Sequence, residues 1–154
     1  MEVTLKSKEK RYMLIHVEIQ GYKQEIFPER IFDYYCRLRP KAKRENKDLI
    51  CLCLFIVSEK SYKPNKFLYK FENFKIEFVY PAVNIYELKE RALEYIEKNI
   101  RNIYAYITLM AIESFKIEKK IKKKNKEEVL KEFIDEFAVP FIKRLLKEGI
   151  WGGK

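Results

Sequence analysis

The stretch Tyr12-Met13-Leu14-Ile15-His16-Val17-Glu18-Ile19-Gln20 decides the predicted fold. Its first half is apolar at successive positions, which is typical of a central strand buried on both faces. Polar and apolar residues then alternate, so the side chains of His16, Glu18 and Gln20 share one face of the strand. A carboxylate on a central strand is costly unless it is paired or binds a metal. The alternative is that the strand end reaches solvent and that Glu18 and Gln20 are ordinary exposed residues.

Around this strand the chain alternates between strand-like and helix-like segments. We expect strands over 3–6, 49–57, 67–71 and 74–80, with a turn at Glu72-Asn73 between the last two. A helix opens at Pro28 and is ended or kinked by Pro40. Further helices are expected from a capping box at Asn84 and Glu87, from about 103 to 115, and from about 125 with a kink at Pro140. This order predicts an α/β core followed by a helical C-terminal part.

The composition indicates one ordinary domain. The chain has 154 residues, of which 47% are hydrophobic, and no apolar run is long enough to span a bilayer. Residues 1–11 are polar and do not resemble a signal peptide, so we expect a cytoplasmic protein with no membrane partner. The three cysteines make no disulfide framework, and Cys51 and Cys53 alternate within an apolar run as buried structural residues do. The net charge of +10 favours a polyanionic partner, above all nucleic acid.

Several of these residues resemble one known signature. His16-Val17-Glu18-Ile19-Gln20, followed by Phe27-Pro28-Glu29-Arg30 and then by Tyr34, is similar to the PD-(D/E)XK nuclease-like family, in its branch of recombination-promoting nucleases and transposase-associated proteins. The resemblance covers about 1–112. It implies a restriction-endonuclease-like fold, with a mixed β-sheet core flanked by helices, over a single domain 1–154. That domain is N-terminally short and carries a helical C-terminal extension at about 101–150.

The resemblance implies metal-dependent hydrolysis of DNA phosphodiester bonds, as in DNA recombination. The catalytic set is then Glu2, Glu18 and Gln20, with Glu2 and Glu18 as ligands of Mg²⁺ or Mn²⁺. Gln20 stands where most relatives of the wider fold have Lys. A homodimer is one arrangement to expect, because cutting both strands of a duplex commonly needs two active sites. The alternative is a catalytically degraded remnant that binds nucleic acid or a protein.

Basic side chains are the candidates for contacting DNA. Arg30 can bind a phosphate or hold a carboxylate such as Glu18. The run 116–126 is lysine-rich, and its residues Lys122, Lys123 and Lys124 would bind phosphates if they lie on the active-site side. A solvated surface run is the other interpretation of these lysines. His16 shares the face of Glu18, where a core or hydrogen-bonding role is more common for a single histidine than metal binding.

Overall fold

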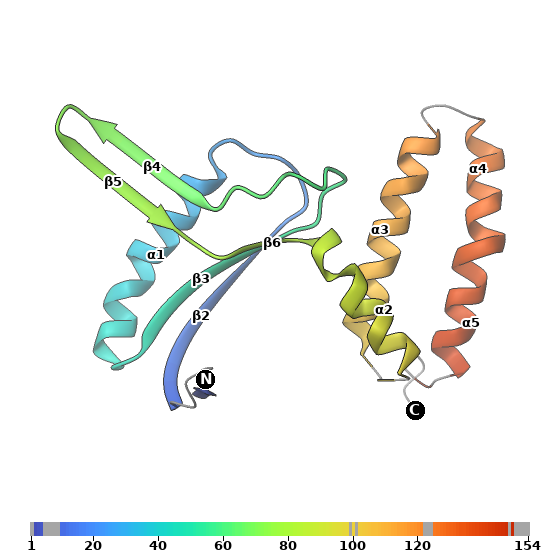
Figure 1. Cartoon of the computed structure of the whole chain (residues 1–154), viewed down its shortest axis with the longest axis horizontal. Coiled ribbons are helices and arrows are strands. Elements are labelled where there is room, and N and C mark those ends of the chain that lie inside the picture. The colour runs from blue at the N-terminus through green and yellow to red at the C-terminus, as the bar shows by residue number, and fades with distance from the viewer. Residues whose placement is uncertain are drawn as a thin grey trace. The chain divides into compact units, whose positions relative to one another are not determined.

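The computed structural model of the chain describes residues 2–4, 10–98, 100, 102–121, 125–147 and 149, with side chains from residue 12 onwards. The chain divides into two compact units, 1–84 and 85–154 (Figure 1). The first unit holds the sheet and the long first helix, and the second is helical. The protein therefore belongs to the mixed α/β class, as the sequence predicts.

A four-stranded sheet forms the centre of the first unit. Its strands are β1 (Glu2–Thr4), β2 (Lys10–Gln20), β3 (Asp48–Phe55) and β6 (Ala82–Asn84), in the order β1-β2-β3-β6. β1 runs antiparallel to β2, whereas β2, β3 and β6 are parallel. Parallel neighbours need a long crossover connection, and between β2 and β3 that connection is helix α1 (Phe27–Arg44).

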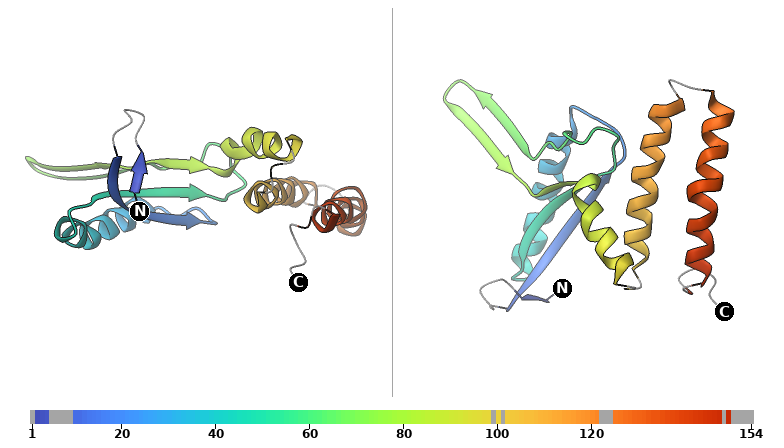
Figure 2. Two further views of the ribbon diagram at one scale, coloured as in Figure 1. Left: turned by 90° about the horizontal axis from the view of Figure 1, so that it is seen from below. Right: turned by 45° about the vertical axis from the view of Figure 1, so that its right-hand side comes forward.

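The core of this unit lies between the sheet and α1, which covers one face (Figure 2). Phe27 and Ile31 of α1 are fully buried, as are Cys53 and Phe55 of β3. The rings of Phe27 and Phe55 meet edge to face at 5.0 Å. Phe27 and Ile31 are four residues apart and so lie on one face of the helix. Cys53 and Phe55 are two residues apart and so lie on one face of the strand, which packs against that helix face. The expected buried cysteines, Cys51 and Cys53, are confirmed.

Strands β4 (Lys66–Phe71) and β5 (Phe74–Val79) form a separate antiparallel hairpin. Phe67 and Phe78, near the open end of the hairpin, pack against Phe32 of α1 with ring centroids 4.9 and 5.5 Å away. The hairpin crosses the helix there, and its turn projects beyond it (Figure 1). The turn expected at Glu72-Asn73 is confirmed, and Glu72 adopts a φ of 48°.

Asn84 lies directly before the helical segment that begins at Ile85, where the sequence predicts a helix start. Asn84 ends β6, a short strand that periodicity does not reveal, and its side chain is fully buried. Its amide nitrogen donates to the backbone oxygens of Glu59 and Tyr62 at 3.1 and 3.0 Å. These bonds tie the long loop before β4 to the sheet. Capping uses the side-chain oxygen as acceptor, so these two bonds do not exclude it, and the capping role of Asn84 stays a prediction.

The second unit begins with a 3₁₀ turn (η1, Ile85–Leu88) that leads into α2 (Lys89–Glu97). Helix α3 (Ile103–Ile121) is followed by α4 (Lys126–Phe133), a π-helical turn (η2, Ile134–Ala138) and α5 (Val139–Lys147). Its buried cluster joins α2, α3 and α5 through Ala92, Ile96, Tyr106 and Leu145. No helix among those described is both long and apolar enough to cross a membrane.

Two expected helix ends differ from the structure. α1 continues through Pro40 to Arg44, where Ala42 is buried and the basic residues of the last turn suit the negative end of the helix dipole. α3 extends past 115 into the lysine-rich run for the same electrostatic reason. By contrast, Asn125 caps α4 by accepting a hydrogen bond from the backbone of Glu127. The π-helical turn ends two residues before Pro140, whose ring cannot take part in regular helical bonding, and the kink expected at Pro140 stays a prediction.

Candidate functional site

Glu18 and Gln20 owe their position to the alternation of side chains at the end of β2. Glu18 pairs with Cys53 and Gln20 with Phe55 in the parallel register. Paired residues of parallel strands point to the same face, so both polar side chains lie beside the buried core and under α1. Gln20 is buried and the side chain of Glu18 is about one-fifth exposed, at 21%. Of the two interpretations of this strand end, the geometry therefore agrees with a buried polar pair.

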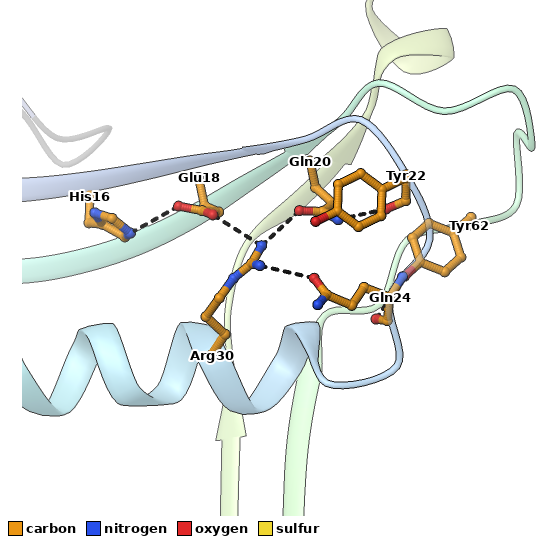
Figure 3. A network of polar contacts seen from close by, with 7 residues as sticks. All are labelled: His16, Glu18, Gln20, Tyr22, Gln24, Arg30 and Tyr62. Carbon is orange, nitrogen blue, oxygen red and sulfur yellow. Dashed lines mark hydrogen bonds and ion pairs between the residues drawn. The ribbon is translucent and has the colours of Figure 1, made fainter.

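Arg30 connects the two side chains. Its Nη2 donates to Oε1 of Glu18 at 3.1 Å and to Oε1 of Gln20 at 2.7 Å, while Nη1 donates to Oε1 of Gln24 at 2.9 Å (Figure 3). Arg30 lies one turn into α1, and its guanidinium also stands 5.0 Å from the ring centre of Phe27. The planar guanidinium suits this arrangement because it directs several donors at fixed angles. The helix thus delivers a positive charge to the polar end of β2.

The loop between β2 and α1 forms further hydrogen bonds beside Gln20 and Arg30. Gln20 donates from Nε2 to the backbone oxygen of Tyr22 at 2.8 Å. The backbone N–H of Gln24 donates to the hydroxyl of Tyr62 at 3.0 Å. Gln24 and Tyr62 are not expected from the sequence. A loop amide and a tyrosine 38 residues further on carry no periodic signal, so only the folded chain brings them together.

His16 lies beside Glu18 but forms a weaker contact with it. Its Nε2 is 3.7 Å from Oε2 of Glu18, which is too long for a hydrogen bond. The imidazole ring packs against Tyr34 of α1 with the two ring centres 4.8 Å apart. Nε2 is buried and accepts or donates no hydrogen bond within the described residues. His16 and Tyr34 thus extend the site by packing, and a polar atom of His16 remains directed at the carboxylate.

The structure does not bring Glu2 to this group. Only the backbone of Glu2 is described, and its strand partner is Tyr12, at the far end of β2 from Gln20. Tyr12 precedes Glu18 by a distance along the strand on the order of 20 Å. One glutamate side chain cannot span that distance. Lys122, Lys123 and Lys124, the expected phosphate-binding residues, lie outside the described residues.

The oxygen donors at the site are few but of the right chemistry for a hard cation. Within the part of the chain that the structure describes, no three His, Cys, Asp or Glu side chains gather as a metal-binding group. Glu18 and Gln20 nevertheless aim one oxygen each at the same cationic nitrogen. Mg²⁺ in phosphate-processing sites commonly uses one or two carboxylates, with phosphates and water as the other ligands. Each of these two oxygens already accepts a hydrogen bond from Arg30, so a Mg²⁺ or Mn²⁺ ion shared by them would have to displace that guanidinium.

The nearby thiols do not fit as ligands. Burial raises the pKa of Cys53 to about 12, and the Glu18 carboxylate contributes to this rise. Burial also raises the pKa of Cys51. Metals bind the thiolate form, so protonated thiols in this core are poor ligands at neutral pH. The chemistry at the end of β2 therefore depends on oxygen donors and on the charge of Arg30.

Comparisons with models of known protein families, with curated proteins and with solved structures found no match to this chain.

Proposed function

We propose that this chain is a metal-dependent DNA endonuclease with a PD-(D/E)XK nuclease-like domain, of the type that promotes recombination and accompanies transposases. One observation carries the proposal. Glu18, Gln20 and Arg30, which belong to the resembled signature, come from a strand and from the following helix and meet in one hydrogen-bonded group. The parallel β2-α1-β3 unit that holds them agrees with a restriction-endonuclease-like core.

Each residue then has a distinct task at the scissile phosphate. Glu18 and Gln20 would hold a Mg²⁺ or Mn²⁺ ion, which when bound polarises the phosphate and lowers the pKa of the attacking water. Gln20 is neutral and cannot supply the positive charge that Lys gives in the wider fold. Arg30 would supply that charge instead, once its guanidinium, which now donates to the amide oxygen of Gln20, turns aside for the metal ion. Its bond to Glu18 fixes the carboxylate in one orientation.

A second candidate is a nucleic-acid-binding module that does not cleave. It is favoured by the position of Glu2, which is paired near the opposite end of β2 and leaves Glu18 as the carboxylate of the described site. In that case Arg30 and Glu18 form a structural ion pair. The charge of +10 then accounts for binding to DNA through phosphate contacts alone.

Nicking of a supercoiled plasmid separates the two candidates. The wild-type chain is incubated with Mg²⁺ or Mn²⁺, beside EDTA and beside a Glu18→Gln variant. Glu18→Gln keeps the size of the side chain and its ability to accept from Arg30, and urea unfolding of the variant beside the wild type checks that the fold tolerates the lost ion pair. The proposal predicts metal-dependent nicking that falls at least about a hundredfold in the variant. Plasmid that is bound but not nicked, or nicking that survives in Glu18→Gln, overturns the endonuclease and favours the binding module.

Plasmid nicking by a contaminating nuclease is excluded by a matched control. Glu59→Gln removes a carboxylate of the same unit that lies on the outside of the long loop and pairs with Lys23. This variant passes through the same purification and should nick at the wild-type rate. Equal loss in Glu59→Gln and Glu18→Gln would show that the effect is not specific to the site.

A further inference from the structure

The β4–β5 hairpin has one face made entirely of apolar side chains. Directly opposite residues share a face in an antiparallel pair, and the register pairs Phe67 with Phe78, Tyr69 with Ile76, and Phe71 with Phe74. Phe67 and Phe78 are covered by α1. The remaining rings are not covered within the described part of the chain. Tyr69, Phe71 and Phe74 are 47%, 62% and 56% exposed.

The exposed rings form an ordered group at the projecting end of the hairpin. Tyr69 and Phe74 meet edge to face with their centres 6.2 Å apart. Figures 1 and 2 show this end of the hairpin extending past α1. Single exposed apolar residues are common on protein surfaces, but neighbouring ones on one face usually mark an interaction site. Their aromatic nature adds a flat surface on which another ring system can stack.

The other face of the same hairpin is basic. Lys70 lies directly opposite Lys75, and like charges in that position repel each other. The carboxylate of Glu77 approaches Lys75 at 2.6 Å and Lys66 at 3.5 Å, so one acid is shared between two lysines. An anion that approaches the hairpin would relieve this repulsion. Although they lie on the face opposite the rings, Lys70 and Lys75 are next to Tyr69, Phe71 and Phe74 along the two strands, and their long side chains can reach the edge of this narrow ribbon. A polyanion at that edge would therefore meet both the positive charges and the rings.

We propose that the end of the hairpin binds unpaired nucleotides, whose bases stack on Phe71, Phe74 and Tyr69 while Lys70 and Lys75 attract the phosphates. Aromatic platforms with cations nearby bind single strands with little sequence preference, because every base has a π-face. The net charge of +10 of the chain favours a polyanion over a protein partner on this surface. The inference rests on the proposed action on DNA and narrows its substrate class to DNA with an unpaired or distorted segment.

Fluorescence anisotropy tests this with a labelled oligo-dT strand and with a labelled duplex of equal length, both in EDTA so that no cleavage occurs. The decisive variant is Phe71→Leu/Phe74→Leu, which keeps an apolar surface and removes the rings. It should lose about tenfold or more in affinity for the single strand and less than about twofold for the duplex. Leu68→Ala, an exposed apolar residue on the lysine face, is the matched control and should keep the wild-type affinity.

Each other outcome overturns the inference. Equal single-strand affinity of the wild type and the double leucine variant removes the stacking role. A wild-type dimer in sedimentation velocity that Phe71→Ala/Phe74→Ala converts to a monomer assigns the aromatic face to a second copy. If the wild type binds neither probe, both the hairpin site and the proposed action on DNA are contradicted. If nicking depends on Glu18 but the leucine variant binds oligo-dT as the wild type does, only the hairpin site is contradicted. If binding depends on the rings but no nicking is seen, only the proposed endonuclease is contradicted.

Discussion

Arg30 is the residue on which the site depends, because two of its nitrogens serve three acceptors from β2 and the following loop. Arg30→Ala leaves Glu18 and Gln20 without a donor in a largely buried position. We expect a loss of about 2 kcal/mol in the free energy of unfolding, measured with urea. Arg30→Lys should restore little of it, since one ammonium cannot reproduce the fork of donors.

The matched control for that loss is Arg39→Ala on the same helix. Arg39 is exposed, and it donates to the hydroxyl of Tyr35 at 3.0 Å. Its removal should cost less than about 0.5 kcal/mol. Similar losses in the two alanine variants would contradict a special role for Arg30 in holding the polar group.

Cys53 gives the first unit a defined response to alkaline pH. Burial raises its pKa from about 9 to about 12 in the folded chain. Between these values the unfolded chain loses a proton that the folded chain keeps, so stability falls as pH rises through this window. The contribution is at most about 1.4 kcal/mol per pH unit. Urea unfolding at several pH values should show a shallower decline in Cys53→Ala than in the wild type.

The exposed Cys36 supplies the comparison for this pH series. Cys36→Ala should decline with pH as steeply as the wild type does. An unchanged slope in Cys53→Ala would show that the buried thiol does not govern the response. Tyr80, whose pKa is also raised by burial, would then be the next residue to replace.

At the scale of single residues, the sequence predicts part of the site. Alternation along β2 places Glu18 and Gln20 on one face, and the resemblance adds Arg30, so the sequence predicts three of the four residues that the hydrogen bonds of Arg30 join. It does not predict Gln24 and Tyr62, because loop residues have no period that fixes their direction. Glu2 follows from its separation along the chain alone. A separation along the chain does not fix a position in space. Because β1 pairs antiparallel with β2, Glu2 lies opposite Tyr12, far from the end of β2 that carries Glu18 and Gln20.

At the scale of elements, the β4–β5 turn carries a local strain. Glu72 has a φ of 48°, a left-handed value that costs energy for a residue with a Cβ. Glu72→Gly should therefore raise the free energy of unfolding by about 0.5 to 1 kcal/mol. Asn73→Gly is the control, because Asn73 is not among the residues with positive φ and gains nothing from glycine. Stabilisation by the second variant and not by the first would contradict the turn geometry.

Periodicity identifies most elements and misses their ends. The stripe of Phe27 and Ile31 predicts α1, yet Pro40 does not stop it, because the buried Ala42 and the favourable dipole contacts outweigh one missing hydrogen bond. Asn84 directly precedes a helical segment, as its spacing to Glu87 predicts, but that spacing does not reveal that its side chain is buried against the long loop. β6 is too short for alternation to reveal it. In each of these cases the outcome depends on tertiary packing, which a local sequence pattern does not reveal.

At the scale of the whole molecule, the charge of +10 predicts binding to DNA that weakens with salt. Replacing Lys122, Lys123 and Lys124 by Gln should reduce the slope of log affinity against log salt by up to about 0.9 for each phosphate that the run neutralises in the wild type. The control replaces three lysines elsewhere in the chain, namely Lys89 of α2, Lys131 of α4 and Lys143 of α5. Equal slopes for the two triple variants would mean that the run has no special part in binding.

The α/β class and the helical C-terminal part follow from the order of the periodic segments, and the structure confirms both. The division at 84 and 85 is not expected from the sequence, because no linker-like composition marks it. Each unit has its own buried cluster, built from residues of that unit alone. Local hydrophobic periodicity shows that such clusters form, but it does not show where one ends and the next begins.

The metal at Glu18 is the claim on which the proposed chemistry depends, and Mn²⁺ reports on it directly. Electron paramagnetic resonance measures free Mn²⁺ as the wild-type chain and Glu18→Gln are titrated in the presence of a short phosphodiester. The account predicts one bound Mn²⁺ per wild-type chain and a site weaker by about tenfold or more in the variant. Equal binding by the two proteins, or no binding by the wild type, would contradict a metal centre at the end of β2.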